Sequence, residues 1–198
     1  MANFRAITAV CESVVYMLRS NYDPNDFNNE LEFLVYSASD FAAPMEAGIS
    51  LFLYRILPDG THRIPTGRIN TNGQRYQTRL PVNLYFLLTT WGKTASLQHT
   101  IAGWMLRTLE DHPILPIGLL NTVLPDVFHP DETVEISLTD LSNEDLLRVW
   151  EMLPQSTYRL SVPYVARSIR LESTQPLSQG QPIQERTTHY HNANTASP

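Results

Sequence analysis

The chain has 198 residues and a mass of 22.5 kDa, which fits one domain with a short extension. Hydrophobic residues make up 42% of it, which is enough for a packed core and excludes a fully disordered protein. The formal net charge of −6 argues against a general nucleic-acid binder held by phosphate neutralisation.

The basic residues and the single cysteine narrow the class of protein further. Of the 14 basic side chains, 13 are arginine and only Lys93 is lysine, and arginine favours bidentate and stacked contacts at interfaces. Cys11 is the only cysteine, which excludes an internal disulfide, and its helical context predicts a buried thiol. No secretory signal is visible, and no apolar run reaches the ~20 residues that cross a bilayer. We therefore expect a chain that folds in a reducing cytoplasm.

The first half of the chain predicts one helix followed by three strands. Apolar residues at helical spacing indicate a helix over residues 3–20, and a short strand is expected within Leu31–Ser37. The strongest strand patterns cover residues 48–57 and 82–91 and are apolar on both faces. Such strands belong in the middle of a sheet that is covered on both sides. The helices of this chain must cover one face, and either further helices or a neighbouring subunit must cover the second.

The connection between these two strands, Pro58–Pro81, is longer than structureless loops in compact domains usually are. Asp59–Gly60 and Asn72–Gly73 are turn signals. The segments Arg68–Ile69 and 75–78 can pair as a small hairpin. The pattern predicts a projecting β-arm, and a disordered loop is the alternative.

The second half begins with a helix predicted over Leu97–Glu110, with Ser96 as its N-cap. The apolar stretch 113–125 contains three prolines and a glycine, so it can hold only short helical or irregular pieces. A strand is expected over Thr133–Leu138. Ser142 then begins a capping box that opens a further helix.

The last predicted element is a strand over Tyr158–Leu171. Its apolar phase slips by one residue at Pro163, which indicates a bulge there and favours an edge strand. From Glu172 onward the composition is polar and predicts a flexible tail. The expected organisation is a domain over residues 1–171 and a tail over 172–198. The expected fold class is α/β (α+β), with a mixed, mostly antiparallel sheet of about four to five strands flanked by three helices.

No motif for catalysis or cofactor binding is present. Glycine-rich phosphate loops, paired-histidine zinc-protease motifs and nucleophile elbows are absent from the sequence. Three groups of reactive residue types lie in predicted turns or in the tail, where solvated polar side chains are common: His129 with Asp126, Asp131 and Glu132; Ser37 with Ser39 and Asp40; and His189 with His191. We therefore predict no catalytic residue, no cofactor, no metal site and no enzyme activity.

Charge is segregated along the chain. Residues 55–107 carry seven basic side chains and one acidic one, and residues 108–153 carry ten acidic side chains and one basic one. The two segments have net charges of +6 and −9. If each formed one surface, subunits would meet head to tail, and such contacts close into rings when the rotation fits. Two ordinary solvated faces are the alternative.

Several blocks, in this order, resemble one family: FRAITAVCESVVYML, GISLFLYRILPDGTHR, LPVNLYFLLTTWG, LQHTIAGWMLRTLEDHPIL and YRLSVPYVARSIRLES. Together they span about residues 4–173. The chain is similar to the N-terminal domain of the cap, or tail-terminator, protein of phage-tail-like contractile injection systems. The resemblance implies a non-enzymatic α/β subunit of a sixfold ring. That ring sits on the last layer of the inner tube, touches the end of the sheath and stops polymerisation.

The resemblance also implies partners and a location. The partners are further copies of the chain in a ring, the inner-tube protein and the sheath protein, without nucleic acid and without direct membrane insertion. The location is the bacterial cytoplasm during assembly, as part of the particle.

Together with the predicted arm and edge strand, the resemblance points to a set of interface residues: Arg63, Arg68, Arg75, Arg79, Tyr158, Arg159, Tyr164, Arg167 and Arg170. Two other functions stay open at this point. One is a nucleic-acid-binding module that uses the basic segment 55–107, and the other is a small hydrolase with dispersed catalytic residues.

Overall fold

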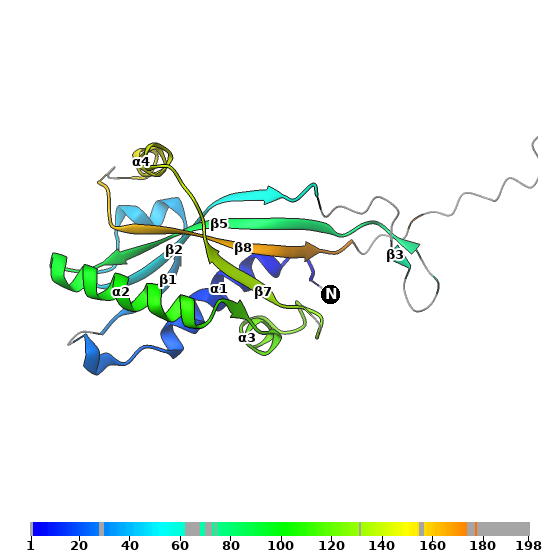
Figure 1. The fold of residues 1–198 in the computed structure, drawn as a ribbon, viewed down its shortest axis with the longest axis horizontal. Coiled ribbons are helices and arrows are strands. Elements are labelled where there is room, and N and C mark those ends of the chain that lie inside the picture. The colour runs from blue at the N-terminus through cyan, green and yellow to red at the C-terminus, as the bar shows by residue number, and fades with distance from the viewer. Residues whose placement is uncertain are drawn as a thin grey trace, which may run out of the picture.

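The computed structural model describes residues 2–27, 30–61, 68–69, 73, 75–130, 132–154, 157–173 and 177. A six-stranded sheet runs through the centre of the molecule (Figure 1), in the order β1 (Glu32–Tyr36), β2 (Gly48–Pro58), β5 (Leu80–Trp91), β8 (Ser161–Leu171), β7 (Val134–Leu138) and β6 (Ile114–Leu115). β1 pairs with β2 in parallel, and every other neighbouring pair is antiparallel. The mixed, mostly antiparallel sheet is confirmed, and the two-residue β6 is the strand that the sequence pattern missed.

Helices cover the two faces of the sheet unequally. α1 (Ala6–Ser20), α2 (Ala95–Asp111) and α3 (Ile117–Val123) lie on one face (Figure 1). α4 (Asn143–Glu151) lies on the other, where its Trp150 packs against Phe41 of a short 3-10 helix. Two short 3-10 helices, η1 (Pro24–Asp26) and η2 (Ala38–Ala42), flank β1. There are thus four α-helices where three were expected, because α3 forms a seven-residue helix between prolines of the stretch 113–125.

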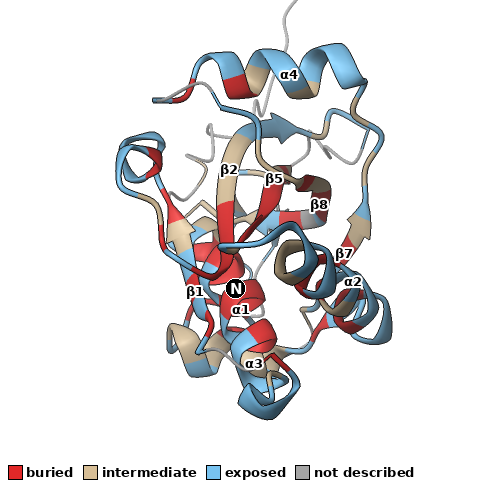
Figure 2. Cartoon of the chain, turned by 90° about the vertical axis from the view of Figure 1, so that its left-hand side faces the viewer, coloured by how far each residue is buried: buried red, intermediate tan, exposed pale blue. Residues whose placement is uncertain are grey.

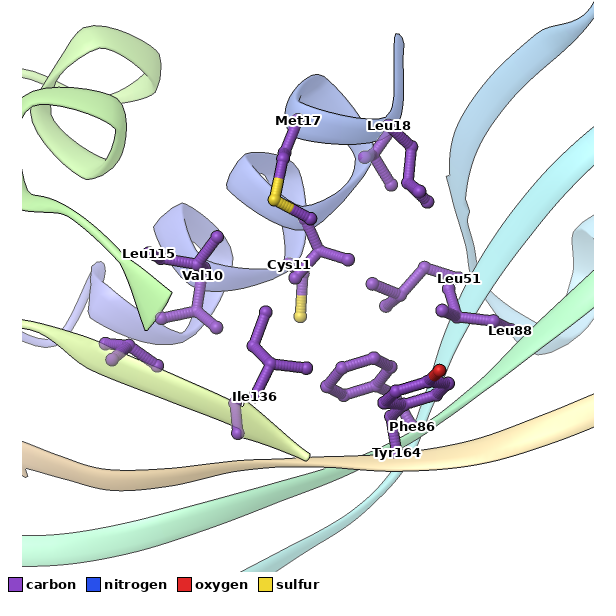
Figure 3. Packing of buried hydrophobic residues seen from close by; sticks show 14 of the residues in the cluster. Val10, Cys11, Met17, Leu18, Leu51, Phe86, Leu88, Leu115, Ile136 and Tyr164 are labelled. Atoms are coloured by element: carbon purple, nitrogen blue, oxygen red, sulfur yellow. The ribbon is translucent and has the colours of Figure 1, made fainter. Parts of the chain in front are cut away.

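The main core lies between α1 and the sheet. Val10, Cys11 and Met17 of α1 point toward Leu51 and Phe86 on the central strands (Figure 3), and all five are buried. The buried positions face one another across this layer, whereas the outward faces of α2 and α4 are exposed (Figure 2). At about 25 cal/mol per Å² of apolar surface, this layer supplies most of the hydrophobic stabilisation.

A smaller apolar cluster lies on the α4 side of the sheet. It contains Tyr36, Phe41, Met45, Trp91, Trp150 and Leu153, all buried. Trp91 donates from its indole nitrogen to the Ser50 hydroxyl at 2.8 Å, so the one polar group of this buried ring has a hydrogen-bond partner. The prediction that β2 and β5 are central and covered on both faces is therefore confirmed over the part of the sheet beneath α4.

The prediction that the last strand lies at an edge is wrong, because β8 lies between β5 and β7. Pro163 is tolerated there because β7 ends at Leu138, opposite Tyr164, so the missing N–H of Pro163 faces the end of its neighbour. Thr139 still donates to the Pro163 carbonyl at 3.2 Å. The bulge is present but lies farther along, where the residue opposite β5 shifts from Ala166 to Ile169.

The helix starts follow local capping chemistry. The Ser142 hydroxyl accepts from the Asp145 N–H at 3.1 Å, which confirms the predicted start of α4. α2 begins two residues earlier than expected because the Thr94 hydroxyl, and not that of Ser96, accepts from the Leu97 N–H at 3.2 Å.

The predicted arm is a hairpin of β3 (Arg68–Ile69) and β4 (Arg75–Tyr76), which lies beyond one end of the large sheet (Figure 1). Gly73 has a φ of +74°, the left-handed conformation that turns favour for glycine. Arg63 and Asn72 lie outside the described residues.

Contacts of the chain continue past the predicted domain boundary at residue 171. The Glu172 N–H donates to the Ala2 carbonyl at 2.9 Å, and the Leu177 N–H donates to the Arg75 carbonyl at 2.8 Å. The division into residues 1–171 and 172–198 stays a prediction, and the tail histidines His189 and His191 lie outside the described residues.

Gly48 provides a test of the β1–β2 pairing. Its φ is +145°, and an added Cβ would lie 1.9 Å from the Glu32 carbonyl oxygen on the paired strand. We expect Gly48→Ala to lower the free energy of unfolding by ~3 kcal/mol or more, because strain and steric overlap combine. Gly103→Ala is the matched control: it has open space around it and should stabilise α2 by ~0.5–1 kcal/mol. Urea denaturation measures both, and equal stability of the two variants would contradict this account of the pairing.

Candidate interaction surfaces

Two of the groups of reactive residue types found in the sequence have structural roles in the described part of the chain. The Ser37 N–H and hydroxyl both donate to the Asp40 carboxylate at 2.7 Å, which caps η2 and lowers the Asp40 pKa. The Glu132 carboxylate accepts from the His129 N–H at 2.8 Å and closes a turn. Asp131 lies outside the described residues, and among those that are described no group of three His, Cys, Asp or Glu side chains could hold a metal ion.

An open pocket of about 530 Å³ lies where α2 begins, beside the start of β1. Its charged lining residues are mostly acidic: Asp26, Glu30, Glu32, Glu46 and Lys93. Lys93 contacts Glu46 at 2.7 Å and lowers its pKa, which keeps this carboxylate ionised at neutral pH and unsuited to donate a proton. No histidine is among its lining residues, so a nucleophile–base pair built on histidine is not assembled there.

The arm presents part of the predicted basic surface. Arg75 is exposed on β4, and Arg68 lies opposite Tyr76 on β3. Arg79, at the root of the arm, instead contacts Glu172 through its Nε at 2.7 Å, and the Glu172 side chain is almost fully buried. Arg79 therefore attaches the root of the arm to the end of β8, a role that the sequence pattern did not indicate.

Arg167 and Arg170 lie at the far end of β8, as exposed side chains beside an open pocket of about 290 Å³. Glu135, directly opposite Arg167 on β7, and Glu132 line the same pocket. The arginines predicted from the last strand are thus brought together, but next to carboxylates of the same subunit.

Tyr158 and Arg159 lie beneath α4. The Tyr158 ring meets the Trp150 ring edge to face at 6.0 Å, and the Arg159 guanidinium lies 5.8 Å from the centre of the Trp91 ring. Tyr164, by contrast, is only 4% exposed and stacks on Phe86 in the main core. Its side chain does not reach the surface, which corrects its place among the predicted interface residues.

The charge segregation of the sequence does not become one acidic surface. Acidic residues of the segment 108–153 lie on α4 over one face of the sheet and on α2 on the opposite face (Figure 1). Arg107 also pairs with Asp111 one turn along α2, across the boundary between the basic and acidic segments. Tertiary structure distributes these charges because α2 and α4 pack on opposite faces.

Sequence reasoning missed a surface formed by Tyr54, Arg55, Leu57 and Tyr85, which we call the tyrosine platform. The Arg55 guanidinium lies 5.7 Å from the centre of the Tyr85 ring, and the Tyr54 and Tyr85 rings are 6.5 Å apart. One tyrosine on each of two strands that were both predicted to be central, with Arg55 directly after Tyr54, was the signal that could have marked it.

The buried thiol gives a pH-dependent prediction. Burial raises the pKa of Cys11 to about 12, above the ~8.5 of an unfolded cysteine. The protonated thiol therefore contributes stability below the unfolded pKa, and this contribution is lost as pH rises from ~8.5 toward 12. We expect the native thiol to react with a disulfide reagent at pH 8 at least ~100-fold more slowly than the urea-unfolded thiol. Cys11→Ala should reduce the fall in unfolding free energy between pH 8 and 10, and rapid native labelling would contradict burial of the thiol.

No helix in the described part of the chain has the length and apolarity needed to cross a membrane.

Comparison with known proteins shows which proteins share this fold. No curated protein is significantly similar in sequence. The sheath/tube terminator of the PVC extracellular contractile injection system, in its extended state, matches with a TM-score of 0.62 and 16% identity over 96% of this chain. The tube-terminating cap of the anti-feeding prophage matches with a TM-score of 0.57 and 18% identity over 91%.

These two similarities establish a shared fold, and the aligned region spans 65% and 60% of the two solved chains. The family model described as the Pvc16 N-terminal domain matches residues 9–185, which is most of the sequence. The match extends past residue 171, where the folded domain was expected to end. The chain therefore belongs to the Pvc16 N-terminal domain family.

Proposed function

We propose that this protein is a structural cap, or tail-terminator, subunit that forms a ring on the end of the inner tube and sheath of a contractile injection system and stops their polymerisation. The observation that carries the proposal is the family match over residues 9–185. The shared fold with a sheath/tube terminator and with a tube-terminating cap supports it.

The proposed partners are further copies of the chain, in a ring that the family resemblance gives as a hexamer, together with the inner-tube protein and the sheath protein. The role requires no catalysis, no nucleic acid and no direct membrane insertion. Assembly would take place in the bacterial cytoplasm, and the finished subunit would be part of the particle.

The fold offers a rigid body and a projecting element for this role. The body is the helix-covered sheet, and the arm extends beyond it with Arg75 exposed (Figure 1). An arginine on such an element can form bidentate contacts with carboxylates of a neighbouring tube or sheath subunit. Arg79 instead holds the root of the arm through Glu172, so we assign it to positioning the arm.

The remaining predicted interface residues stay part of the proposal according to where they lie. Arg63 and Arg68 belong to the arm segment, Tyr158 and Arg159 lie beside α4, and Arg167 and Arg170 lie at the end of β8.

The arm is tested by charge reversal that leaves its root intact. We expect the double variant Arg68→Glu, Arg75→Glu to abolish capping, seen as loss of the uniform tube and sheath length when particles assemble with this variant. The variant should remain folded, because β3 and β4 lie outside the six-stranded sheet. Arg107→Glu is the matched control: it reverses an exposed cation on α2, where surface ion pairs contribute at most ~1 kcal/mol. Particles of unchanged length with the double variant would contradict the role of the arm, and uncapped particles with the wild-type chain would contradict the proposed function itself.

A further inference from the structure

In the described part of the chain, no helix covers the half of the α4-side face that lies toward the arm (Figure 1). α4 packs on this face through Trp150 and Leu153, which contact Trp91 and Phe41 near the end of the sheet where β5 finishes. The strands β2 and β5 continue well beyond this cluster toward the arm (Figure 1). Over that second half lies the tyrosine platform, in which Arg55 and Leu57 are exposed and Tyr54 and Tyr85 are half-buried.

A β-bulge builds the platform. The residue opposite Phe86 is Leu53 and the residue opposite Tyr85 is Arg55, so Tyr54 is the extra residue of β2. Because a bulge turns neighbouring side chains toward the same side of a sheet, Tyr54 and Arg55 both lie beside Tyr85. Tyr54 is half-buried, and its pKa is raised, mainly by this burial and to a lesser extent by the Asp145 carboxylate at the start of α4.

The composition and rigidity of the platform are those of a protein-binding surface. Tyrosine and arginine are the residues over-represented at positions that dominate binding energy. Here the Tyr54 and Tyr85 rings already lie against each other at a tilt of 59°, and the Arg55 guanidinium lies over the Tyr85 ring, so little side-chain entropy remains to be lost on binding. Leu57, 36% exposed, extends the apolar part of the surface toward the end of β2.

The occupant is indicated by the neighbouring half of the same face. There the sheet already carries a helix, α4, so a second helix laid beside it would complete the layer. α4 itself has an outward face that suits the platform. Leu147 is 48% exposed, and Met152, the C-cap residue that follows α4, is 88% exposed. Glu151 is an exposed carboxylate beside them, whereas Glu144 is paired with Arg148 one turn along the helix. This combination of apolar and acidic side chains matches the rings and the arginine of the platform.

We propose that the tyrosine platform binds the outward face of α4 from a second copy of this chain. The proposal rests on the proposed function in one respect, since a ring needs contacts between copies. The two surfaces are different patches of one subunit. After two copies have met, one copy still has its platform available and the other its α4 face, so further copies can add and the contact can repeat around a ring. The rings of Tyr54 and Tyr85 pack against Leu147 and Met152, and Arg55 pairs with Glu151.

A charge exchange between the two surfaces tests the contact. In the full chain, we expect Arg55→Glu and Glu151→Arg each to weaken self-association about tenfold or more, as measured by sedimentation. The double variant Arg55→Glu, Glu151→Arg should regain most of the wild-type association, because the pair is restored with opposite signs. Arg107→Glu and Glu110→Arg, on α2 on the opposite face of the sheet, are the matched controls and should associate like the wild type.

The outcomes separate this contact from the proposed function. Single variants that associate normally, or a double variant that is no better than either single one, would overturn the contact even where particles are still capped. A wild-type chain that stays monomeric at about 100 μM with tube present would also overturn it. Salt-sensitive binding of a single-stranded oligonucleotide that Tyr85→Ala abolishes, without any effect on self-association, would assign the platform to nucleic acid instead. Normal capping with disrupted self-association would overturn the ring and leave the family assignment unchanged.

Discussion

The fold depends on one constraint: the central antiparallel pair of β2 and β5 is apolar on both faces and must be covered on both. On one face the requirement is met by α1, whose Val10 and Val14 are buried in the same cluster as Leu51 and Leu84. On the other face it is met by α4 through Trp150, but only over the part of the sheet near Trp91. Because burial of apolar surface is the main favourable term in folding, the unequal cover decides both where the molecule is most stable and where it has surface left for partners.

Strand length explains why one end of the molecule is well covered and the other is not. β2, β5 and β8 are adjacent and have 11, 12 and 11 residues, whereas β1 and β7, which lie on either side of these three strands, have five each. The long strands therefore extend past the helix layers toward the arm. The proposed functions of the arm and of the tyrosine platform both follow from this difference in length. Among the described residues, β1 pairs with β2 only as far as Phe52, and no helix covers the rest of this face, so a partner can complete it.

Local patterns predicted most elements, and failures came where distant segments decide the outcome. Two-sided apolar runs marked β2 and β5 as central, and the capping chemistry of Ser142 marked the start of α4. The position of β8 was predicted wrongly because the rule that proline favours an edge strand assumes a neighbouring strand that needs its N–H. Here β7 ends at Leu138, one residue before the position opposite Pro163, so an interior strand can hold this proline. Tyr164 was taken for a surface residue because its orientation depends on this same pairing. Contacts at the surface were harder still to predict from the sequence, since Arg79 and Glu172 are 93 residues apart in the chain and yet their side chains meet at 2.7 Å.

The sequence by itself determined the element types, the central strands, the hairpin in the arm and a buried, unreactive cysteine. Those features depend on side-chain periodicity and turn chemistry within a few residues. Only the tertiary structure decided that β8 is interior, that α4 packs on the face opposite α1 and α2, and that Tyr54, Arg55 and Tyr85 form one surface. The physical reason is that strand register and the layering of helices are set by pairing and burial between distant segments. A linear separation of charge, such as the +6 and −9 segments, therefore became a pattern spread over both faces of the sheet.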